Sequence, residues 1–123
     1  MDVNKLHDAV DYLKDALRGN LIATDIFGVE DGQSIAGYNT QPTASALFAR
    51  MVVDLNMVLK DGGFPSLGKY FLLDLVNDHK IIIVPMGKYA WGVLVSKDAQ
   101  IGLITNVVLP KMIDRFEEAL MAQ

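Results

Sequence analysis

The apolar positions of this chain change their spacing several times, and each spacing predicts a different element. In residues 2–17 apolar side chains recur every three or four positions, which is the spacing of one helix face, and Asp2 is a suitable N-cap. Residues 21–30 and 33–38 are largely apolar and flank Asp31-Gly32, a dipeptide typical of a tight hairpin whose two turn residues take positive φ. The pattern therefore predicts an N-terminal helix followed by a β-hairpin.

The most apolar segment, residues 44–60, predicts a long helix with Thr43 as its N-cap and with two apolar stripes. The wide stripe contains Ala44, Leu47, Phe48, Met51, Val52, Leu55, Val58 and Leu59. The narrow stripe contains Ala46, Ala49, Val53 and Met57. Because two stripes need two covering surfaces, we expect the wide stripe to pack on the protein's own sheet. The narrow stripe favours a helix of a second subunit, and the alternative is a helix of the same chain.

After a break at Gly62-Gly63 and Pro65, residues 68–77, 80–86 and 88–96 predict three strands joined by short turns. The last two are apolar on both faces, so we expect them near the centre of a sheet with helices on both sides, and Trp91 in the core. Residues 101–122 predict a final helix. Pro110 lies either in the first turn of a helix that starts near Asn106 or at a kink in a longer one.

The predicted order is helix, two strands, helix, three strands and helix. This order belongs to the α+β class, with a five-stranded antiparallel sheet and helices on both faces. With 123 residues and no linker-like segment, residues 1–123 are expected to form a single domain.

Composition narrows the function classes. The hydrophobic fraction of 51% excludes intrinsic disorder, and the absence of cysteine excludes disulfides and thiolate chemistry. A net charge of −4 argues against nucleic acid as the main partner. The longest apolar run, residues 81–86, is too short to span a bilayer, and the charged N-terminus is no signal peptide. We therefore expect a cytoplasmic protein.

Candidate chemistry is sparse. His7 and His79 are far in sequence from any glycine-flanked serine, and the neighbouring acidic pairs lie in a predicted turn and on a predicted helix surface. Residues 63–69 match the spacing of a GxxxxGK phosphate loop, but Tyr70 replaces the required Ser or Thr. A helix also precedes this loop, whereas a phosphate loop opens one. We expect no catalytic, cofactor or metal site, and no enzyme activity.

Three stretches carry a family resemblance over nearly the whole chain. They are residues 23–39 (ATDIFGVEDGQSIAGYN), the long apolar helix, and residues 88–104, including KYAWGVLVSKDAQIGLI. Together with the element order, they resemble the Roadblock family of dynein light chain-type proteins. The Asp31-Gly32 turn and the Gly102-Leu103 step before the last helix match this family's pattern, and Pro110 departs from it.

The resemblance implies a homodimer in which the central helices lie side by side and outer edge strands join the two sheets. The edge strand would be residues 68–77, with Tyr70, Leu72 and Asp74 on one face beside the narrow helix stripe. Members of this family are regulators or scaffolds of small Ras-like GTPases, or subunits of motor complexes, and are not enzymes. The expected function is thus a homodimeric GTPase-binding adaptor. The alternatives are a small-molecule sensor domain and a structural subunit of a larger complex.

Overall fold

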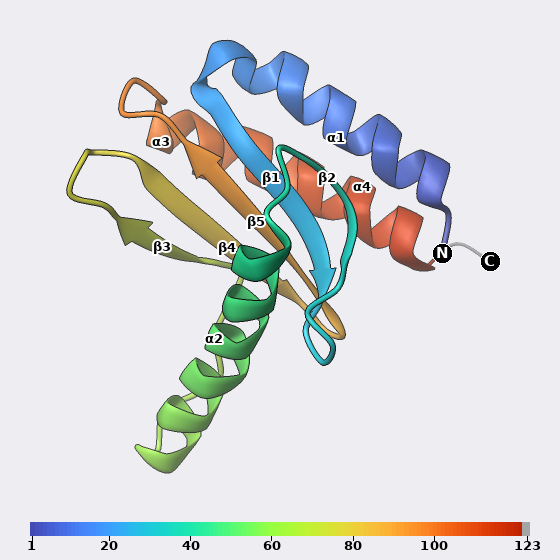
Figure 1. Cartoon of the computed structure of the whole chain (residues 1–123). Coiled ribbons are helices and arrows are strands. Elements are labelled where there is room, and N and C mark those ends of the chain that lie inside the picture. Colours follow the sequence, from blue (N-terminus) through green and yellow to red (C-terminus); the bar gives the residue numbers. More distant parts are fainter. Residues whose placement is uncertain (122–123) are drawn as a thin grey trace.

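The computed structural model describes residues 1–121, and its five strands form one antiparallel sheet in the order β2-β1-β5-β4-β3. Figure 1 shows this sheet with α1 and α4 on one side and α2 on the other. The strands are β1 (Leu21–Gly28), β2 (Ser34–Tyr38), β3 (Phe71–Asp74), β4 (Lys80–Met86) and β5 (Tyr89–Val95). The main helices are α1 (Val3–Leu17), α2 (Pro42–Asp61) and α4 (Leu109–Met121). The predicted fold class is confirmed.

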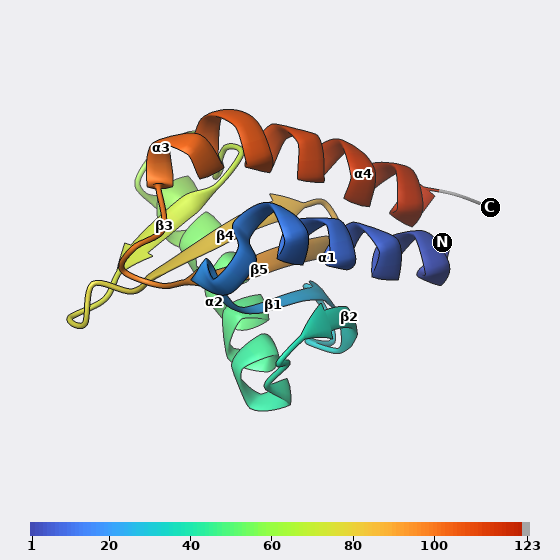
Figure 2. The same ribbon diagram turned by 90° about the horizontal axis from the view of Figure 1, so that it is seen from above.

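The larger core lies between the sheet and the pair α1 and α4, which run side by side above it (Figure 2). Trp91 on β5 is fully buried there, and its ring centroid lies 4.9 Å from that of Phe116 on α4. Its indole N–H donates to the Thr24 hydroxyl on β1 over 2.7 Å, and that hydroxyl donates to the Gly92 carbonyl over 2.8 Å. The predicted core position of Trp91 is confirmed, because β5 is the central strand.

The hairpin between β1 and β2 differs from its prediction. Strand β1 ends at Gly28 instead of residue 30, and the connection is a longer loop closed by bonds between Gly28 and Gln33 and between Gly32 and Gly28. Only Gly32 takes a positive φ, of 69°, while the Asp31 carboxylate accepts the backbone N–H of Gln33. An aspartate that bonds its own backbone two residues on stabilises a turn without entering the left-handed region itself.

Strand β3 is shorter than predicted, with four residues in place of residues 68–77. Its ladder with β4 begins at the pair Phe71 and Ile83, two residues before Pro85. Because proline has no backbone N–H, β4 cannot extend the ladder in that direction. Tyr70 therefore lies outside the strand.

The start of α2 also differs from its prediction, whereas the start of α1 does not. Helix α2 starts at Pro42, with Gln41 as a cap that makes no side-chain bond, so Thr43 is not the N-cap. Proline is suited to the first helical position, where its missing N–H has no partner to lose. Asp2 is confirmed as the N-cap of α1, since its carboxylate accepts the Lys5 N–H over 3.1 Å.

The last helical segment is continuous. Of the two alternatives for Pro110, the structure therefore has the longer helix and not one that starts near Asn106. It runs through α3 (Ile101–Leu103), a π-helical turn η2 (Ile104–Val108) and α4. The Leu109 N–H bonds the carbonyl of Ile104, five residues back, immediately before Pro110. This wider turn absorbs the local disturbance of the helix ladder next to a proline that cannot donate. Ala122, the predicted last residue of this helix, lies outside the described residues.

Candidate functional site

Helix α2 touches the sheet along a narrow inner face. Ala49 and Val52 are both 3% exposed and form the second, smaller core with Phe27, Ile83 and Ala90. In Figure 1, α2 crosses the sheet and its C-terminal end projects beyond it. The helix therefore has a large surface that the described chain does not cover.

That surface carries two apolar flanks on either side of a polar ridge. The ridge is formed by Arg50 and Asp54, whose charged groups lie 3.8 Å apart. At about 100° per residue, apolar side chains line up along the helix on both sides of this ridge and form one flank on each side. The first, which we term the Leu47 flank, contains Leu47, Met51, Leu55 and Val58. The second, the Val53 flank, contains Ala46, Val53 and Met57.

The two predicted stripes need correction. The narrow stripe included Ala49, but this residue is buried against the protein's own sheet. The wide stripe was expected to face the sheet, but Leu47 and Val58 are 62% and 67% exposed. The inner face is set by Ser45, Ala49 and Val52, so it takes Val52 from the wide stripe and Ala49 from the narrow stripe, with Ser45 between them.

The Val53 flank has a neighbour within the chain. It borders a groove shared with the loop between β1 and β2, where Ala46 and Gly32 are in close contact. A Cβ added to Gly32 would lie 2.8 Å from the Cα of Ala46. The small size of Ala46 is thus explained by this loop, whereas Val53 and Met57 remain 42% and 57% exposed.

The predicted edge residues lie along the outer side of the sheet, because β3 is its last strand. Tyr70 is 41% exposed just before the strand, and Leu72 is half-buried against the larger core. Asp74 is exposed and its carboxylate lies 3.3 Å from the Lys80 ammonium. The outer backbone groups of β3 have no strand partner in the described chain, so this edge is open to pairing.

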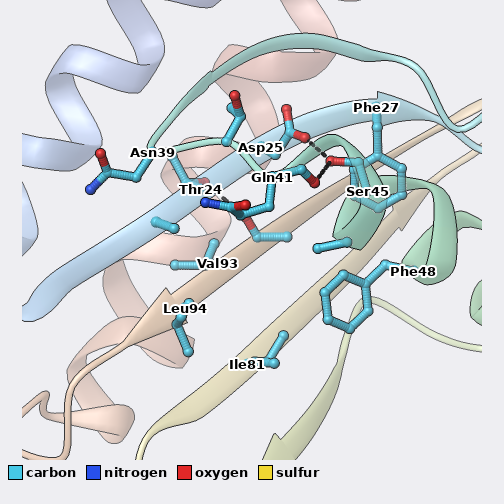
Figure 3. A pocket seen from close by; sticks show the side chains of 14 residues that line it. Thr24, Asp25, Phe27, Asn39, Gln41, Ser45, Phe48, Ile81, Val93 and Leu94 are labelled. Atoms are coloured by element: carbon cyan, nitrogen blue, oxygen red, sulfur yellow. Dashed lines mark hydrogen bonds between the residues drawn. The ribbon is translucent and has the colours of Figure 1, made fainter.

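A pocket of about 120 Å³ opens beside the first half of α2 (Figure 3). Ala44 and Phe48, which line it, lie next to the Leu47 flank at about 100° per residue. The surface that the pocket walls expose is almost entirely apolar, although Asn39, Thr40 and Gln41 also line it. Ala44 and Phe48 come from α2, Phe27 from β1, Ile81 from β4 and Leu94 from β5. Gly92 and Ala23 leave room at the sheet because they carry little or no side chain.

Asp25 lies at one end of this pocket and joins three elements. Its carboxylate accepts the Ser34 hydroxyl of β2 over 2.5 Å and also bonds the Ser45 hydroxyl of α2. Burial raises the pKa of Asp25, and the hydrogen bonds from Ser34 and Ser45 oppose this rise only in part. Within residues 1–121 no cation pairs with Asp25. The sequence analysis missed this cluster, although a single acid within the apolar stretch of β1 was a usable signal.

The geometry offers little for catalysis. Over residues 1–121 no group of three His, Asp or Glu side chains is placed to hold a metal ion. The loop that resembles a phosphate-binding motif leads from α2 into β3, so no helix N-terminus follows Lys69. None of the helices in this described range is long and apolar enough to cross a membrane.

Comparison with known proteins places the fold. No family model and no curated protein matches the sequence. Among solved structures, MglB from Myxococcus xanthus superposes with a TM-score of 0.78 at 14% identity, covering 98% of this chain and 93% of MglB. A Roadblock/LC7 domain from Streptomyces avermitilis gives 0.74 at 12% identity, covering 99% of this chain and all of that domain, 100%.

Profilin IB from Acanthamoeba castellanii is a more distant neighbour, with a TM-score of 0.64 at 17% identity over 91% of this chain and 97% of the profilin. The chain therefore has the Roadblock/LC7 fold, and profilin shares much of the same arrangement of helices and strands. At these identities the likeness concerns the fold alone.

Proposed function

We propose that this protein is a homodimeric, non-catalytic adaptor that binds and regulates a small Ras-like GTPase. The observation that carries the proposal is an exposed apolar flank on α2 next to an open sheet edge, in a fold shared with a Roadblock/LC7 domain and MglB. Large exposed apolar patches are typical of surfaces that meet another protein. The GTPase as partner follows from the family resemblance of the sequence.

The dimer would form across β3. A second copy related by a two-fold axis at this edge would extend the sheet and satisfy the unpaired backbone groups. Because the Val53 flank faces the loop between β1 and β2, the Leu47 flank is the side available to the partner's helix. Of the sequence-predicted interface residues, Tyr70, Leu72 and Asp74 stay at the edge. Ala46, Val53 and Met57 border the interface instead of forming its centre.

The molar mass in solution tests the dimer directly. Light scattering on the purified protein is expected to give about twice the mass of one chain, 13.5 kDa. A mass equal to one chain over the accessible concentration range would refute the dimer.

The GTPase role needs a separate experiment. The purified protein is immobilised and exposed to extract of its own host with either GDP or a non-hydrolysable GTP analogue, and captured proteins are identified by mass spectrometry. A small GTPase enriched in one nucleotide state is expected, because a regulator of this class distinguishes the switch conformations. Failure to bind any GTPase in either state would refute the adaptor role.

Two alternatives make different predictions. A structural subunit would form the same dimer and bind its partners with no dependence on nucleotide. A small-molecule sensor would carry a ligand in the pocket beside α2, visible by native mass spectrometry.

A further inference from the structure

We infer that Phe64 of each subunit occupies the pocket beside α2 of the other subunit, so that two reciprocal aromatic contacts lock the dimer. This inference rests on the dimer of the proposed function and names the contact that would stabilise it. It concerns one exposed side chain, one apolar pocket and the reach of the helix that joins them.

The reach of α2 follows from its length. Its 20 residues span about 30 Å. Its start is held over β1 by the bond between Ser45 and Asp25, and three strand spacings, about 14 Å, separate β1 from the edge strand β3. The helix rises about 24 Å from Ser45 to Asp61, so about 10 Å of it, roughly its last third, extends past β3. Figures 1 and 2 show the end of α2 on the β3 side of the sheet. In a dimer joined at β3, this last third, with Gly62, Gly63 and Phe64 beyond it, would lie over the partner's sheet.

Phe64 is fixed at the end of this projecting helix. The Phe64 N–H bonds the Leu59 carbonyl over 2.8 Å, and the Gly63 N–H bonds the Lys60 carbonyl over 3.1 Å. With Gly63 at a φ of 80°, these two bonds form a Schellman motif, which closes the helix firmly. The Phe64 side chain is nevertheless 65% exposed. An exposed aromatic side chain on a fixed backbone is well suited to anchor an interface, since the backbone loses little freedom on binding.

The pocket has the size and chemistry of a phenyl site. Its volume of about 120 Å³ is close to the roughly 150 Å³ of an engineered apolar cavity that binds benzene. Its walls include Phe27, Phe48, Ile81 and Leu94. Because Ala44 and Phe48 lie next to the Leu47 flank, the pocket is on the side of α2 that would face the partner. An apolar occupant fits these walls better than a charged or strongly polar ligand would.

Two-fold symmetry makes the contact reciprocal. The pocket lies over the first half of α2 and Phe64 follows its last turn, so in an antiparallel pair of these helices each end meets the other's beginning. Each dimer would bury two phenyl rings, and neither ring would need to move far from its place in the single chain.

A double-mutant cycle on the full chain tests the contact. Phe64→Ala removes the ring, and Ala44→Leu fills the pocket from α2 with a residue that favours helix. Dimer dissociation constants are measured by sedimentation equilibrium. Phe64→Ala is expected to weaken the dimer about thirtyfold or more, as for an interface hot spot. Ala44→Leu in the Phe64→Ala background is expected to cause no further loss, because the pocket then has no ring to exclude.

The control is Met121→Ala, which removes an exposed side chain from α4 on the opposite face and is expected to leave the dimer unchanged. A dimer with unaffected dissociation in Phe64→Ala, or with independent losses from the two changes, would overturn the contact and leave the dimer standing. A monomeric wild-type protein would refute the dimer itself. A small molecule retained in the pocket of the purified dimer would also overturn the contact.

Discussion

At the residue scale, Asp25 is the side chain with the most unusual surroundings. It is 9% exposed, and its carboxylate faces serine hydroxyls from β2 and α2 but no cation within residues 1–121. The Ser45 hydroxyl carries one proton and has two acceptors, the Asp25 carboxylate and the Gln41 carbonyl 3.3 Å away. A protonated Asp25 can donate to Ser45 and leave the serine proton for Gln41, which explains how burial of this acid is tolerated.

The raised pKa of Asp25 makes folding stability depend on pH. Because the folded protein holds this proton more tightly than the unfolded chain, its contribution is complete below the pKa of an unfolded aspartate. It is lost as pH rises through the higher pKa of the folded state. Asp25→Asn has no such proton, so its free energy of unfolding should rise relative to wild type as pH increases from about 4, the ordinary pKa of an aspartate. Urea unfolding at several pH values measures this difference.

The matched control for Asp25 is Asp54→Asn on the polar ridge of α2. Asp54 is exposed and forms a surface ion pair, so the change should alter stability by less than about 1 kcal/mol. If the free energies of unfolding of Asp25→Asn and wild type vary in parallel with pH, the hydrogen bonds to Asp25 fully offset the effect of its burial.

A second prediction at this scale concerns the Thr24 hydroxyl, which accepts the fully buried Trp91 N–H. Thr24→Val keeps the shape of the side chain but leaves the indole N–H without its acceptor. The free energy of unfolding should fall by about 1 to 3 kcal/mol. Thr105→Val is the control, since Thr105 bonds only carbonyls of its own helix and should cost less than about 1 kcal/mol. Equal losses in the two variants would contradict the assigned role of Thr24.

At the element scale, the contact between α2 and the loop that follows β1 depends on Gly32. This residue has a φ of 69° and its missing Cβ leaves space for Ala46. Gly32→Ala should destabilise the protein by about 2 to 4 kcal/mol, because backbone strain and a collision with the helix backbone add. Gly63→Ala shares the positive φ, of 80°, but meets no atom within 4 Å, so it should cost only about 1 to 2 kcal/mol. Thermal unfolding of both variants isolates the loop contact, and equal losses would argue against it.

Helix α2 shows which features of the fold can be predicted from the sequence and which cannot. The element order and the central, doubly buried β4 and β5 follow directly from local apolar spacing. The side of α2 that packs on the sheet does not follow from this spacing, because apolar residues occupy more of the helix circumference than one sheet can cover. The deciding features are contacts between distant segments, such as Ser45 with Asp25 and Gly32 with Ala46. Likewise, the start of β3 depends on Pro85 in the neighbouring strand, which no pattern within β3 indicates.

At the scale of the whole molecule, one sheet face is covered by two helices and the other only by α2. A single chain thus leaves the half-buried Ile81 and Leu94 and the Leu47 flank without a covering layer. Pairing across β3 would cover this face with the partner's projecting helix. The extension of α2 past its own sheet and the open edge then have one common explanation.

The two flanks of α2 distinguish this arrangement from a dimer through the narrow stripe expected from the sequence. The double change Leu47→Glu and Val58→Glu would place like charges against the partner's helix without disturbing the inner face of α2. We expect it to weaken the dimer at least about a hundredfold, equivalent to about 3 kcal/mol or more. The matched pair Val53→Glu and Met57→Glu alters the opposite flank and should weaken it less than about tenfold. Because all four residues are 42% to 67% exposed, circular dichroism should show a retained fold in both variants. The reverse order of dissociation constants would move the interface to the Val53 flank and with it exclude the pocket beside α2 from the dimer contact.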